Sequence, residues 1–194
     1  PSKQDDRSLF RFKPGYKTIP IKTELDWKEW GGFSKAVEMC NNNGHCRKFD
    51  AGTMCPSFRV TREEQHLTRG RANTLRLALS GQLGPDAFTS DEMVKAMDLC
   101  VSCKGCKREC PTGVDMARMK IEVMHQVRQK QGLGLRERLV AYLPDYARHA
   151  ARWSGLLNAR NKLGWMAKLM EQVAGISSRR SLPTWESRHF FNRG

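Results

Sequence analysis

The sequence predicts a mostly α-helical protein, and three observations support this fold class. Apolar residues recur at the three- and four-residue spacing of an α-helix in several segments. A Thr followed by Glu three positions later opens two of these segments, as in a helix capping box. The stretch between Cys55 and Cys100 alone holds both of them.

The N-terminal part, residues 1–32, is predicted to be an extended lead-in arm. Proline and glycine interrupt it, and one alternating patch over residues 16–21 predicts a short strand.

Residues 33–132 are predicted to form the main helical domain. Its expected helices run from Ser34 to Met39, over 62–80, from Thr89 into Cys100, and from Met116 to near Gly132. Thr61 with Glu64 opens the second helix, and Thr89 with Glu92 opens the third.

The C-terminal part is predicted to comprise accessory helices over residues 133–180 and a linker tail over residues 181–194. The three accessory helices are separated at Pro144, Gly155 and Gly164. We expect the apolar stripe with Trp153 and Trp165 to pack against its own domain, the alternative being a partner or a membrane surface.

The composition is strongly basic, with 34 Lys and Arg against 20 Asp and Glu and a formal net charge of +14. Such a surface predicts an acidic partner. No run approaches the roughly 18 apolar residues of a membrane helix. The first residues also lack the apolar core of a signal peptide. Because the chain starts with Pro1, we expect it to be processed or to be a piece of a longer chain.

The seven cysteines fall into two groups instead of being spread along the chain as in a disulfide framework. This grouping favours metal binding in a reducing compartment, which we take to be the cytoplasm.

The second group matches the run C-x2-C-x2-C-x3-C-P with which bacterial ferredoxins bind cubane iron-sulfur clusters. Its members are Cys100, Cys103, Cys106, Cys110 and Pro111. The first three thiolates bind one cubane, and Pro111 turns the chain so that Cys110 reaches a second one. We expect Gly105 to leave room for the inorganic core and to adopt a positive φ. A zinc knuckle and disulfides are the alternatives, although four cysteines this dense crowd a single tetrahedral ion.

The first group, which consists of Cys40, Cys46 and Cys55, resembles a degenerate copy of the same run, with Asn43 where the second cysteine would stand. The complete run needs a further thiolate from a distant Cys-Pro pair, and Cys55-Pro56 fits this need. The expected ligands of one 4Fe-4S cluster are Cys100, Cys103, Cys106 and Cys55. The expected ligands of a second cluster are Cys40, Cys46 and Cys110.

With three thiolates, the second cluster is either a 3Fe-4S cluster or a 4Fe-4S cluster whose last iron takes water, Asn43 or His45. The alternative is a single cluster, with the first group of cysteines serving only as small buried residues.

Basic residues near the cysteines are expected to stabilise a reduced cluster and raise its potential, unless they form a solvated loop face. They are Lys104, Lys107, Arg108, Arg47 and Lys48. The segment Arg69-Gly70-Arg71 also allows two interpretations. It has a functional role if it folds over a cluster or contacts a flavin domain, and it is ordinary helix surface otherwise.

Several segments resemble the helical two-cluster ferredoxin domain of glycolate oxidase iron-sulfur subunits and succinate dehydrogenase. The similarity is greater to the iron-sulfur segment of large bacterial FAD-linked D-2-hydroxyglutarate dehydrogenases. The segments that carry it are residues 40–48, 52–64, 66–73 and 100–115. In that family an FAD-binding dehydrogenase portion precedes this segment, and a cysteine-rich domain follows it.

The resemblance implies an electron-transfer module of a dehydrogenase. Electrons from FAD in the adjoining portion, reduced by a D-2-hydroxyacid, would pass through the two clusters to an acceptor. No GxGxxG, P-loop, HExxH or nucleophile elbow occurs in the sequence, so no catalytic residue is expected in this segment.

Two alternatives belong to other classes of protein. A cationic nucleic-acid-binding protein stabilised by zinc or a cluster fits the charge, but it lacks a basic patch with interleaved aromatics, and we expect no nucleic-acid partner. A hydratase-like site with an open iron needs acid and base residues that the sequence does not provide.

Overall fold

The structure is a computed structural model that describes residue 12 and residues 15–187. Its α-helices are α1 (Phe33–Glu38), α2 (Pro56–Thr61), α3 (Thr68–Leu79), α4 (Asp91–Asp98), α5 (Gly105–Glu109), α6 (Met116–Gln131), α7 (Leu135–Ala141), α8 (Leu143–Ala150), α9 (Ser154–Lys162) and α10 (Gly164–Ala174). Short 3-10 turns are η3 (Lys28–Trp30), η4 (His45–Arg47), η5 (Glu64–His66), η6 (Ala87–Thr89) and η7 (Ala151–Trp153). No strand occurs among the described residues, and the predicted mostly α class is confirmed.

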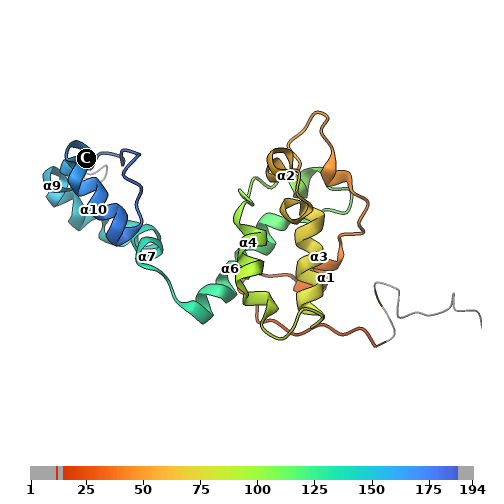
Figure 1. The fold of residues 1–194 in the computed structure, drawn as a ribbon. Coiled ribbons are helices and arrows are strands. Elements are labelled where there is room, and N and C mark those ends of the chain that lie inside the picture. Colours follow the sequence, from red (N-terminus) through yellow and green to blue (C-terminus); the bar gives the residue numbers. More distant parts are fainter. Residues whose placement is uncertain (1–11, 13–14, 188–194) are drawn as a thin grey trace, which may run out of the picture. The chain divides into compact units, whose positions relative to one another are not determined.

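The chain divides into two compact units between residues 131 and 132. Helices α1 to α6 belong to the first unit and α7 to α10 to the second (Figure 1). All seven cysteines lie in the first unit.

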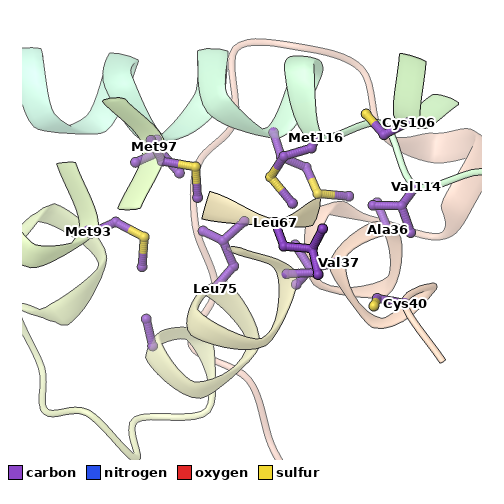
Figure 2. Close-up of a cluster of buried hydrophobic side chains, with 14 of the residues drawn as sticks. Ala36, Val37, Cys40, Leu67, Leu75, Met93, Met97, Cys106, Val114 and Met116 are labelled. Carbon is purple, nitrogen blue, oxygen red and sulfur yellow. The ribbon is translucent and has the colours of Figure 1, made fainter. Parts of the chain in front are cut away.

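The core of the first unit forms where α1, α4 and α6 pack against α3. Figure 2 shows Val37, Leu75 and Met97 converging from three of these helices. Cys40 and Cys106 belong to the same buried set and are each 7% exposed. Because interiors of this kind are close-packed, the core holds both cysteine segments in defined positions.

Helix α6 has the apolar stripe that the sequence predicts. Met116, Met119, Val123 and Val127 are buried along one face of it. The helix ends at Gln131, before Gly132 at φ 78°, a left-handed conformation that suits glycine at a helix end.

The described part of the lead-in arm is tied to α6 through the buried carboxylate of Glu122. Its oxygens accept hydrogen bonds from the backbone N–H of Leu25 at 2.7 Å and from Trp27 Nε1 at 2.9 Å. The described part of the arm contains no strand, and the prediction of one over residues 16–21 is wrong. The Ile19 N–H instead donates to the Leu79 carbonyl at the end of α3, at 2.7 Å.

Two helices start later than predicted, and in both cases the hydroxyl group of the predicted cap, Thr61 or Thr89, donates to a preceding carbonyl group. Thr61 ends α2, and its Oγ1 donates to the Ser57 carbonyl at 2.9 Å, so it does not open a helix at residue 62. Helix α3 begins only at Thr68. Helix α4 is capped by Ser90, one residue after the predicted Thr89, because its Oγ accepts from Met93 N–H at 3.2 Å.

The second unit contains four α-helices among its described residues, where the sequence predicts three. Two asparagines of α9 hold the tail. Asn158 exchanges two hydrogen bonds with the Trp185 backbone, and Asn161 exchanges two with the Leu182 backbone. Trp153 and Trp165 are 67% and 65% exposed, so the expectation that they pack on their own domain is wrong.

Among the described residues, none of the helices combines the length and the apolar character needed to cross a bilayer.

Candidate iron-sulfur site

Four cysteines from two distant segments line one recess of the first unit. Cys55 precedes α2, while Cys100, Cys103 and Cys106 come from the loop before α5 and from its first turn. Cys55 and Cys106 are buried, Cys100 is half-buried, and Cys103 is exposed. Cys110 does not line this recess. The structure thus brings together one of the two sets of cysteines that the sequence analysis groups.

The thiols surround the recess without converging on a point. Within the described residues, no three His, Cys, Asp or Glu side chains are close enough together to hold one metal ion. An iron-sulfur cluster binds its thiolates through separate irons, so an all-sulfur donor set spread around a recess fits such a group.

Unusual backbone conformations occur throughout the two cysteine segments. Cys55, Ser102 and Lys104 have φ values of 51°, 53° and 59°, a left-handed region that side chains disfavour. Such conformations accumulate at functional sites, where the surrounding structure holds them in place.

Gly105 does not have the predicted positive φ, and that expectation is wrong. It lies in α5, and the left-handed conformations fall on its neighbours instead. The structure shows a different reason for a small residue at this position from the expected one, because a Cβ on Gly105 would lie 2.8 Å from Thr53 Oγ1. The glycine therefore allows α5 to approach the loop that leads to Cys55.

Backbone amides at two helix starts face the buried sulfurs. Burial raises the pKa of the Cys106 thiol, and the N–H groups of Met116 and Ala117 at the start of α6 oppose this effect. Burial likewise raises the pKa of Cys46 to about 11, opposed by the N–H of Arg69 at the start of α3. Burial outweighs the amides for both free thiols, while the amides at the helix starts favour the negative charge that a metal-bound thiolate carries.

Two cysteines of the first group, Cys40 and Cys46, are buried but do not line this recess. Cys40 follows α1, Cys46 lies in η4, and both are buried. Electrostatic repulsion from Cys40 and Cys55 adds to the increase in the pKa of Cys46. Cys110 is half-buried, with its Sγ 3.3 Å from Thr112 Oγ1.

The two residues considered as extra iron ligands lie at the surface. Asn43 and His45 are exposed, and Asn43 Oδ1 accepts a hydrogen bond from the His45 backbone N–H at 2.9 Å. This oxygen thus serves the local turn.

Glu109 fastens the two cysteine segments to each other. Its carboxylate accepts hydrogen bonds from Thr53 N–H at 2.7 Å, Thr53 Oγ1 at 2.8 Å and Met54 N–H at 2.9 Å. Lys48 Nζ lies 3.2 Å away. These donors, Thr53 foremost, lower the pKa of Glu109 to about 2. Sequence reasoning missed this residue, although it is the single acidic residue between Cys100 and Cys110.

The basic residues near the cysteines have several kinds of surroundings. Lys48 pairs with Glu109, and Lys107 lies 3.8 Å from Asp115. Arg47, Lys104 and Arg108 are exposed, as expected for a solvated loop face. Within the segment Arg69-Gly70-Arg71, in contrast, Arg71 is only 1% exposed and its Nη1 lies 3.8 Å from Cys55 Sγ.

Comparison with known families assigns the class of domain that this site defines. Residues 36–114, which include all seven cysteines, match the 4Fe-4S dicluster domain family. This part of the chain is therefore similar to ferredoxin-type iron-sulfur domains, in agreement with the prediction.

Individual relatives confirm the resemblance inferred from the sequence. The chain is 28% identical to a D-2-hydroxyglutarate dehydrogenase of Pseudomonas putida and 27% identical to one of Escherichia coli, over 78% and 82% of its own length. It spans only 18% of the length of each of these two enzymes. It is also 26% identical, over 44% of its length and 19% of the relative, to a probable glycolate oxidase iron-sulfur subunit of Bacillus subtilis. No solved structure matches the chain.

Proposed function

We propose that this chain is the electron-transfer module of an FAD-linked D-2-hydroxyacid dehydrogenase, with D-2-hydroxyglutarate as the substrate of the whole enzyme. The observation that carries the proposal is the recess in which Cys55 joins the three cysteines of the Cys100–Cys106 run.

In this proposal, two sets of cysteines each hold one iron-sulfur cluster. Cys55, Cys100, Cys103 and Cys106 hold a 4Fe-4S cluster, and Cys40, Cys46 and Cys110 hold a second cluster of the 4Fe-4S or 3Fe-4S type. The presence of Cys55 in the recess and the position of Cys110 outside it support this crossed assignment. An iron-sulfur cluster accepts and releases single electrons without moving substrate atoms.

The chain's own residues hold the thiols in position and shelter them. Glu109 keeps the Cys55 loop against α5 through three hydrogen bonds. The amides that begin α3 and α6 stabilise negative charge on Cys46 and Cys106. The packed core excludes water from one side of both sets.

The substrate chemistry is assigned to portions of the enzyme outside this chain. The curated dehydrogenases are more than five times as long as the stretch that matches, which leaves room for an FAD-binding portion and a further cysteine-rich domain. The +14 charge suits docking to an acidic flavin portion or acceptor. Free cysteines throughout the first unit support a reducing, cytoplasmic setting.

The first experiment determines which metal the chain binds. Protein purified without oxygen should contain iron and acid-labile sulfide and give an electron paramagnetic resonance signal after reduction with dithionite. Zinc without sulfide would contradict the proposal and favour the zinc-stabilised nucleic-acid-binding alternative.

The second experiment tests the source of the electrons in the full-length enzyme. Addition of D-2-hydroxyglutarate should reduce the clusters, and L-2-hydroxyglutarate should leave them oxidised. Clusters that stay oxidised while the flavin is fully reduced by substrate would contradict an electron-transfer role.

A further inference from the structure

The start of α3 lies between the two sets of cysteines. The backbone N–H of Arg69 faces Cys46, and Arg71 Nη1 lies 3.8 Å from Cys55 Sγ. The glycine between these two arginines is needed for packing, because a Cβ on Gly70 would lie 1.9 Å from the Glu64 carbonyl oxygen. One helical turn thus presents a different arginine to each set of thiols.

Arg71 is a buried cation whose neighbours are neutral in the absence of thiolate. It is 1% exposed, and it lines the recess together with the four cysteines. Its Nε donates to the Ala96 carbonyl at 2.6 Å, and its Nη2 donates to Ser57 Oγ at 3.2 Å. Over the described residues, no carboxylate lies within 4.0 Å of its guanidinium.

A guanidinium group stays protonated in proteins, so Arg71 cannot lose its charge when it is buried. Burial of an unpaired charge is strongly unfavourable. Cys55 is the ionisable side chain that Arg71 contacts. The recess therefore favours a negatively charged occupant held by thiolates.

Arg69 has a different environment, although it lies only two residues away. Its side chain is 22% exposed, and its Nε pairs with Glu64 Oε1 at 2.6 Å. The nearby carboxylate offsets much of its charge, so Arg69 provides a natural comparison for Arg71.

We propose that Arg71 is the counter-charge of the cluster held by Cys55, Cys100, Cys103 and Cys106, and that it sets the reduction potential of this cluster. The inference rests on the proposed function. Reduction adds one electron, supplied by flavin in the enzyme or by dithionite in the test, and hence one negative charge. The permanent positive charge of Arg71 stabilises this added charge and raises the potential, without uptake of a proton.

The test is a dithionite titration of the 194-residue chain, followed by electron paramagnetic resonance. Iron and sulfide are measured first, since their absence from the unmodified protein would reject the proposed function itself. The signal that disappears in Cys103→Ser identifies the cluster concerned.

Arg71→Gln should lower the potential of that cluster and leave the other one within the error of the titration. At a fixed potential, the ratio of reduced to oxidised cluster should fall at least about tenfold, which is about 59 mV for one electron. Arg71→Lys should restore most of the shift, because it keeps the charge. Arg69→Gln should change the ratio for this cluster less than about threefold, because Glu64 already offsets its charge.

The variants also distinguish an electrostatic role from a purely structural one. Loss of iron from Arg71→Gln together with its retention in Arg71→Lys would support the need for a counter-charge. An unchanged potential in Arg71→Gln with full iron content would overturn the proposal. Loss of iron from both variants would also overturn it, since Arg71 would then serve packing alone.

Discussion

At the scale of single residues, Cys55 is the position on which the proposed ligation depends. Its backbone is left-handed, with φ 51°. The residue is buried beside three cysteines that follow it in the chain by 45 positions or more. Left-handed conformations of this kind accumulate at functional sites, which agrees with the proposed role of Cys55 as a ligand.

Cys55→Ser should therefore abolish the same resonance signal that Cys103→Ser abolishes. A serine oxygen is a poor substitute for thiolate in iron-sulfur ligation, and both residues line the same recess. The measurement is electron paramagnetic resonance with iron analysis on both variants. If Cys55→Ser kept this signal while Cys110→Ser removed it, the crossed assignment would be wrong.

Gly70 is a second residue at which the structure predicts the effect of a substitution on stability. Gly70→Ala places a methyl group where the Glu64 carbonyl lies, so η5 or α3 must move. We expect the free energy of unfolding to fall by about 1–3 kcal/mol, the usual cost of overpacking, as measured by urea denaturation.

The matched control is Gly155→Ala in the first turn of α9, where an added Cβ meets nothing within 4 Å. It should leave stability unchanged or raise it slightly, because alanine favours a helix. Equal destabilisation by the two substitutions would contradict the role given to the Gly70 contact.

At the scale of secondary-structure elements, Glu109 at the end of α5 holds the loop that leads to α2. In Glu109→Gln, an NH2 group that cannot accept a hydrogen bond replaces one carboxylate oxygen. The donors on Thr53 and Met54 therefore lose part of their hydrogen bonding. Amide hydrogen exchange at Thr53 and Met54 should become at least about tenfold faster.

Arg108→Gln is the control for this substitution, because Arg108 is the exposed neighbour of Glu109 on the same helix. Exchange at the same two amides should not change in it. An unchanged rate in Glu109→Gln would mean that the loop is held by other contacts.

The elements also show which features of the fold can be predicted from the sequence. Helix α6 is predicted almost to its ends, because its apolar stripe and its terminal glycine act locally. Helix α3 is not, because Thr61 bonds back to Ser57 and the chain then passes through η5 before Thr68. The spacing of Thr and Glu alone cannot tell whether the threonine hydroxyl caps a following helix or bonds back to a preceding carbonyl group.

The same limit applies to the site. The cysteine spacing predicts that Cys55 lies beside the thiols of the Cys100–Cys106 run, since thiolate number and spacing reflect the demands of the cluster. Glu109 and Arg71 act through partners 56 and 16 positions away in the chain, Thr53 and Cys55. Such contacts depend on the folded arrangement, so the sequence left Arg71 undecided and missed Glu109.

At the scale of the whole molecule, the two units should respond differently to loss of the metal. All seven cysteines lie before residue 132, and the second unit has its own ties between α9 and the tail. Because metal binding contributes to folding free energy, removal of the clusters should destabilise the first unit alone.

Hydrogen exchange on protein with and without clusters can test this expectation. Amides of α3 and α6 should lose protection by at least about tenfold when the clusters are removed, and those of α9 and α10 should keep theirs. A parallel loss of protection in both units would contradict the independence of the second unit.

The meeting of Cys55 with Cys100 also has a consequence for the unfolded chain. A group bound by both residues is a covalent cross-link that closes a loop of about 45 residues. By the loop-closure relation used for disulfides, such a link removes about 4 kcal/mol of conformational entropy, expressed as free energy at 25 °C, from the unfolded state. The cluster would then act as a staple for a small domain as well as an electron carrier, and reductive or oxidative loss of its iron would release that chain entropy.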